Sequence, residues 1–70
     1  MYPNPAKSHI YIQSGEQILS ISLSNILGEI VIHKSELENR SIEISNLKNG
    51  IYFVNIKTKS GHITKKLIKE

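Results

Sequence analysis

The chain has 70 residues, no cysteine and a net charge of +3. This length allows one small domain, and a domain of this size buries only about 60% of its unfolded surface, so its core is modest. Without cysteine, neither a disulfide nor a thiolate metal site can reinforce that core. No apolar run is close to the length of about 20 residues that a membrane-spanning helix requires. The totals therefore predict one small domain without cross-links.

The chain begins with MYPNP, in which two prolines flank one asparagine. Proline fixes its own φ and disfavours the helical region for the residue before it, so residues 2–5 are predicted to be extended and stiff. The stretch has neither the apolar segment nor the cleavage site of a signal peptide. We interpret residues 2–5 as an entry strap that leads into the domain from an upstream part of a larger protein.

Alternation of apolar and polar residues predicts six β-strands. Isoleucine, a β-branched residue that favours pleated structure, occurs 13 times. In chain order the predicted strands are HIYI (9–12), ILSISLS (18–24), EIVIH (29–33), SIEIS (41–45), GIYFVNIKT (50–58) and HITKKLIK (62–69). Because no stretch of helical length carries an apolar stripe, we predict an all-β domain, a small antiparallel β-sandwich.

Turn residues separate these strands. Gly28 is available for a positive φ, Asn49-Gly50 is a strong turn dipeptide, and residues 59–61 fit a three-residue hairpin loop with Gly61 in the left-handed conformation. The last strand has an irregular apolar pattern, which a bulge or an edge position would explain. Between two sheets we expect a core of Ile12, Leu19, Ile21, Leu23, Ile30, Ile32, Ile42, Ile44, Leu47, Tyr52, Val54 and Ile56.

No catalytic motif is present in the sequence. There is no aspartate to orient a histidine, no serine in a nucleophile elbow and no glycine-rich loop that leads into a helix. His9, His33 and His62 are dispersed over three predicted strands without a local ligand partner. We therefore predict a protein that is not an enzyme and that binds neither a metal nor a cofactor.

The positive charge is concentrated near the C-terminus. Residues 57–70 carry a net charge of +4, whereas residues 1–56 carry −1. Either these lysines only solubilise the domain, or they face an anionic partner. Nucleic acid is disfavoured as that partner, because Tyr52 and Phe53 point to opposite faces of their strand and the lysines are not interleaved with aromatic residues.

Four stretches follow one another in an order that is typical of one family: YPNPAKSHIYI, ISLSNILGEIV, ISNLKNGIYFVNIKT and ITKKLIKE. Together they resemble the type A C-terminal sorting domain of the type IX (Por) secretion system, from Tyr2 to Glu70. The resemblance implies an immunoglobulin-like sandwich of six to seven strands, the seventh lying within 11–18 or 33–41. It also implies that residues 1–70 are a single sorting domain, excised from a larger secreted protein.

As a sorting domain, the chain would direct its cargo through an outer-membrane translocon, and a sortase-like surface peptidase would usually remove it. The expected route runs through the periplasm to the outer-membrane surface or the medium, without a nucleic-acid partner and without direct membrane insertion. A passive immunoglobulin-like spacer and an adhesive or glycan-binding module are the alternatives.

The resemblance also implies roles for single residues. The structural positions of the family motif are Tyr2, Pro3, Asn4, Pro5, Gly28, Asn49, Gly50 and Tyr52. The basic terminal strand, which we hypothesise is recognised by the translocon, comprises Lys65, Lys66, Leu67, Ile68, Lys69 and Glu70. If this strand lies at a sheet edge, a partner could add to it by β-augmentation, with the lysines steering an acidic surface toward it.

Overall fold

The computed structural model describes residues 5–13, 15–35 and 40–70, and these residues form six β-strands and no helix. The strands are β1 (His9–Tyr11), β2 (Ile18–Ser24), β3 (Ile30–Lys34), β4 (Ser41–Glu43), β5 (Gly50–Thr58) and β6 (Gly61–Lys69). The all-β prediction is confirmed. A seventh strand does not occur among the described residues; of the two segments in which it was expected, residues 14 and 36–39 lie outside them.

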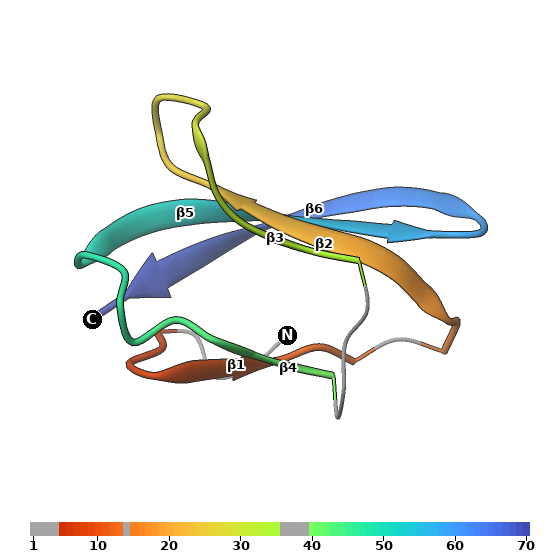
Figure 1. The fold of residues 1–70 in the computed structure, drawn as a ribbon, viewed down its shortest axis with the longest axis horizontal. Coiled ribbons are helices and arrows are strands. Elements are labelled where there is room, and N and C mark those ends of the chain that lie inside the picture. The colour runs from red at the N-terminus through yellow and green to blue at the C-terminus, as the bar shows by residue number, and fades with distance from the viewer. Residues whose placement is uncertain (1–4, 14, 36–39) are drawn as a thin grey trace.

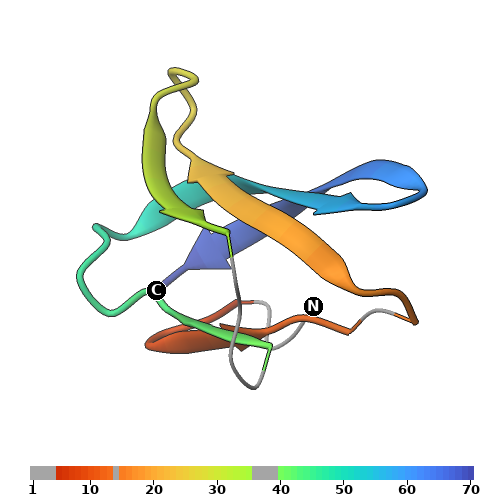
Figure 2. The ribbon, with the colours of Figure 1, turned by 45° about the vertical axis from the view of Figure 1, so that its right-hand side comes forward.

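The strands form two antiparallel sheets (Figure 1). β1 pairs with β4, and Ile10 lies opposite Ile42. The larger sheet has the order β3-β2-β5-β6, so that β3 and β6 are its edge strands. The β1–β4 pair lies on one side of the larger sheet in both ribbon views (Figures 1 and 2). We call the side of the larger sheet that faces β1–β4 its inner face and the opposite side its outer face.

The core lies between the two sheets. Its buried apolar residues are Ala6, Ile10, Ile12, Ile21, Leu23, Ile42, Ile44, Tyr52, Val54, Ile56 and Leu67. Eight of these were predicted from the alternating pattern, and the predicted Ile32 and Leu47 are partly buried against them. Burial of apolar surface stabilises the fold by roughly 25 cal/mol per Å², so this single cluster supplies most of the stability.

Leu19 and Ile30 were predicted to lie in the core, and both predictions are wrong because the strand pairing shifts. Ile18 pairs with Thr58 and Ser20 with Lys57, which leaves Leu19 as the extra residue of a bulge and 37% exposed. Ile18 packs against the core instead. A second shift, between β2 and β3, places Ile30 opposite Ser24 on the outer face, where it is 65% exposed.

The turns agree with the sequence except at the last hairpin. Gly28 has a φ of 86°, as predicted, in the loop between β2 and β3. Thr58 pairs directly with Gly61, so the β5–β6 loop has two residues rather than the predicted three. β6 remains in continuous register with β5 and has no bulge. Its irregular apolar pattern results from its position at the sheet edge.

Candidate functional site

The candidate recognition strand, β6, is covered only in its second half. Residues 62–66 are all exposed, although Ile63 and Lys65 share the inner face with buried Leu67. Figure 1 shows the reason: the β5–β6 hairpin extends beyond the β1–β4 pair, which therefore does not cover its tip. The first half of β6 is thus an exposed edge of the sheet, paired only with β5, and the second half belongs to the core.

The six residues predicted for recognition differ in their exposure. Lys65, Lys66, Ile68 and Glu70 are exposed. Leu67 is fully buried, and Lys69 is only 7% exposed, with its Nζ donating to a main-chain oxygen of Glu70 at 3.0 Å. The expectation that Lys69 is an exposed member of a lysine row is therefore wrong, because Lys69 shares the inner face with Leu67. The exposed charges at the end of this strand are Lys65, Lys66 and Glu70.

The end of β6 pairs with Ala6, the residue that follows the entry strap. The Ala6 amide donates to the carbonyl oxygen of Ile68 at 2.9 Å, and the Glu70 amide donates to the carbonyl oxygen of Ala6 at 2.8 Å. These bonds form a parallel bridge between Ala6 and Lys69, and Ala6 is fully buried. The residue that follows Pro5 is therefore fixed beside the C-terminus. Of the strap, Tyr2, Pro3 and Asn4 lie outside the described residues, and Pro5 is exposed.

The predicted motif around Asn49, Gly50 and Tyr52 stabilises the start of β5. Tyr52 is buried, as predicted, and its hydroxyl donates to the carbonyl oxygen of Lys48 at 2.7 Å. Gly50 has a φ of 152°, which glycine adopts without strain, and it pairs with Lys69 at the end of β6. Tyr52 pairs with Leu67 on the same ladder. The motif therefore holds the terminal strand in place from one side while Ala6 holds it from the other.

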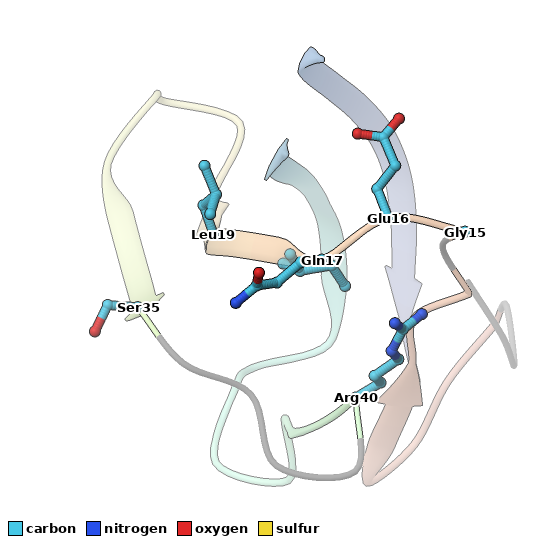
Figure 3. A pocket seen from close by; sticks show the side chains of 7 residues that line it. Gly15, Glu16, Gln17, Leu19, Ser35 and Arg40 are labelled. Atoms are coloured by element: carbon cyan, nitrogen blue, oxygen red, sulfur yellow. The ribbon is translucent and has the colours of Figure 1, made fainter. Parts of the chain in front are cut away.

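A pocket of about 540 Å³ lies beside the first half of β2 (Figure 3), lined by Gly15, Glu16, Gln17, Ile18, Leu19, Ser35 and Arg40. The carboxylate of Glu16 accepts a hydrogen bond from the Ser60 hydroxyl, which lies 2.9 Å from each of its oxygens. This contact ties the β5–β6 loop to the β1–β2 connection. Ser35 lies well apart from Glu16 in Figure 3. Among the described residues that line the pocket, the one hydroxyl belongs to Ser35, and the hydroxyl bonded to Glu16 comes from Ser60 of the β5–β6 loop.

The three histidines do not converge. His9 is on β1, where its Nδ1 lies 3.1 Å from the Ser8 hydroxyl. His33 and His62 are on the two edge strands of the larger sheet, β3 and β6. Within residues 5–13, 15–35 and 40–70, no group of three histidine, aspartate or glutamate side chains could hold a metal ion. The same ranges contain no helix that is long and apolar enough to cross a membrane.

In this small β-domain Ala6 is paired with the end of β6, and the terminal hairpin is basic and exposed. The chain matches the Por secretion tail family, described as the secretion system C-terminal sorting domain, over residues 1–70. It belongs to this family and is a C-terminal sorting signal for type IX secretion, as the resemblance predicted. Sorting domains of this kind interact with the type IX machinery and direct export to the cell surface or extracellular space. Comparisons with curated proteins and with solved structures gave no match.

Proposed function

We propose that the domain carries an upstream cargo across the periplasm, is recognised by the outer-membrane translocon, and is then removed by a sortase-like peptidase at the cell surface. The observation that carries this proposal is the family match over the whole chain. The geometry supports it, because Ala6 is bonded to Ile68 and Glu70. A cargo attached upstream of Pro5 would therefore enter the domain beside its C-terminus, and the domain could be read as a separate unit.

Recognition is proposed to use the exposed part of the terminal strand, residues 62–66, together with the Glu70 carboxylate. Antiparallel pairing turns the backbone groups of alternate residues away from the partner strand. The amide of Ala6 bonds to Ile68, which shows that even-numbered residues of β6 turn outward. A partner strand could therefore pair along His62 and Thr64 without displacing Ala6. Lys65 and Lys66 lie next to this edge and would steer an acidic surface toward it.

An immunoglobulin-like relationship is a further part of the proposal. Its support is the stacking of two antiparallel sheets on one core, as in that class of sandwich. We also propose that the domain is not an enzyme and that it is one unit cut from a larger secreted protein. Support for the first point is the sequence, which has no aspartate to orient a histidine and no serine in a nucleophile elbow.

The test is the mass of the exported cargo. We would fuse residues 2–70 to the C-terminus of a fluorescent reporter and express the fusion in a bacterium with an active type IX system. The expected product at the surface or in the medium is the reporter cut just upstream of residues 2–5, without the domain. A matched fusion that ends at Pro5 should stay inside the cell. Export of both fusions would contradict the proposal and favour a passive spacer.

A further inference from the structure

The outer face of the larger sheet presents apolar side chains that the fold does not cover. The residues are Ile26, Leu27, Ile30, Ile51, Phe53 and Ile68, which we call the outer apolar patch. The register makes part of it continuous: Ile51 lies opposite Ile68, and Ser24 pairs with both Ile30 and Phe53. Contiguous exposed apolar surface with a polar rim marks an interaction site. Its position on the outer face distinguishes it from the backbone edge of β6.

The loop between β2 and β3 contributes the most exposed members of the patch and is rigidly built. Leu27 is 79% exposed and Ile26 is 72% exposed. The Asn25 side-chain oxygen accepts hydrogen bonds from the amides of Leu27 and Glu29, each at 3.0 Å. The Gly28 amide donates to the Asn25 carbonyl oxygen at 3.0 Å. A loop fixed in this way loses little conformational entropy when a partner covers it, which favours binding.

The patch lies on the side away from the core. In both ribbon views the β2–β3 loop rises from the larger sheet on the side opposite β1–β4 (Figures 1 and 2). Phe53 and Ile51 alternate with buried Tyr52 and Val54, so they project from the outer face. Phe53 is 39% exposed and lies beside Ser24 at the base of the hairpin. The loop and the start of β5 are therefore both exposed and apolar on the side of the sheet away from the core, and Phe53 is the aromatic residue among them.

The charge around the patch selects the partner. Lys66 lies opposite Phe53 on β6. Along β5, Asn55 and then Lys57 follow Phe53 on the same face. Of the described strand residues that project from the outer face, none is acidic, and the carboxylate of Glu29 in the β2–β3 loop accepts a hydrogen bond from the Asn25 side-chain amide at 3.1 Å. A second copy of the domain packed on this face would bring lysines against lysines, which is unfavourable. A partner with an apolar centre and an acidic rim is complementary in both respects.

We propose that the outer apolar patch docks onto an apolar, acid-rimmed protein surface of the type IX outer-membrane machinery. The proposal rests on the proposed function and adds a second contact to the one at the β6 edge. A protein fits better than an anionic polysaccharide, because a polyanion would use the lysines and leave Leu27 and Phe53 without a role. Two contacts on adjacent surfaces of one small domain would also fix its orientation in the translocon.

Two substitutions test the patch. Leu27→Ser removes the most exposed apolar side chain, and exposed substitutions change stability by no more than about 0.5 kcal/mol. Phe53→Ser removes the aromatic member, and Ile63→Ser is the control, since Ile63 is 50% exposed but lies on the inner side of the β5–β6 hairpin. Each variant is fused to the reporter, and binding of the purified fusion to the detergent-solubilised translocon is measured. Loss of one central anchor should weaken binding about thirtyfold.

The expected result is poor export and weak binding for Leu27→Ser and Phe53→Ser, with native urea denaturation for Leu27→Ser and normal export for Ile63→Ser. Normal binding of both patch variants would overturn the proposal. The proposal would also be overturned if these variants bound the translocon normally and the domain bound purified anionic lipopolysaccharide in a way that salt abolishes. A third contrary result would be a dimer of the native domain in sedimentation that Leu27→Ser dissociates. If the native fusion itself is not exported, the proposed sorting function is wrong. If the native fusion is exported and the patch variants are exported equally well, only the docking proposal is wrong.

Discussion

Tyr52 gives the sharpest prediction about stability, because its ring and its hydroxyl can be removed separately. The side chain is 8% exposed, and the hydroxyl donates to the Lys48 carbonyl oxygen at 2.7 Å. Tyr52→Phe keeps the ring and removes this hydrogen bond, whose net contribution is about 0.5–1.5 kcal/mol. For a domain of this size, 1 kcal/mol corresponds to a change of about 4–8 °C in Tm. Tyr52→Phe should therefore melt cooperatively, with a Tm that is lower by about 2–12 °C.

Tyr52→Ala removes the ring as well and leaves a cavity beside Leu67, its partner on β6. Truncation of a buried aromatic side chain costs about 3–5 kcal/mol. The total stability expected at about 0.05–0.15 kcal/mol per residue is only about 3.5–10 kcal/mol for this chain. Tyr52→Ala should therefore lose most of its stability and much of its cooperative transition.

Urea denaturation followed by circular dichroism measures both losses through the midpoint and the slope. Phe53→Ala is the matched control: it removes an aromatic side chain from the next position, which is 39% exposed and projects from the outer face. It should cost much less than Tyr52→Ala. Equal losses for the Phe and Ala variants of Tyr52 would show that the ring does not matter. A Tyr52→Ala variant that melts normally but loses its partner would show that Tyr52 is a contact residue, and the account of the core would be refuted.

Two further predictions concern the terminal strand and the β2–β3 loop. Replacing Lys65 and Lys66 by serine should change the free energy of unfolding by no more than about 0.5 kcal/mol and should reduce export, and binding of the native domain should weaken with salt. The same change at exposed Lys7 and Lys34 is the control. Normal export of the Lys65/Lys66 variant would show that these charges only solubilise the domain. Asn25→Ala removes the acceptor for the amides of Leu27 and Glu29. It should lower the free energy of unfolding by about 1 kcal/mol or more and speed hydrogen exchange at both amides, whereas Asn46→Ala, at an exposed position, should do neither. Unchanged exchange at these amides would contradict a rigid loop.

The alternating pattern predicted the class of fold and most of the core because the side-chain period of a strand is two. It failed where the register shifts. The bulge that exposes Leu19 depends on pairing with β5, which is distant in the sequence, and the shift that exposes Ile30 depends on pairing with β2 across a loop. The same limit applies to Lys69. Its burial follows from its pairing with Gly50 and from its bridge to Ala6, and both are tertiary contacts.

The recognition site stays a prediction, and only part of the geometry around the terminal hairpin could be predicted from the sequence. The excess of lysine after residue 57 indicated the terminal hairpin. That Ala6 bonds to the end of β6 could not be predicted, because the prolines at 3 and 5 specify an extended strap but not its partner. The outer apolar patch had one visible signal. Phe53 and Ile51 are apolar on the same parity, opposite to that of Tyr52 and Val54, so one strand carries apolar residues on both faces.

The most direct test of the sorting function compares one reporter in two strains. The reporter fused to residues 2–70 is expressed in a bacterium with an active type IX system and in the same strain without the translocon, and the fraction outside the outer membrane is measured. We predict reporter at the surface or in the medium of the first strain and its retention in the periplasm of the second. Equal amounts outside both strains, or retention in both, would contradict the assignment of these 70 residues as a type IX sorting signal.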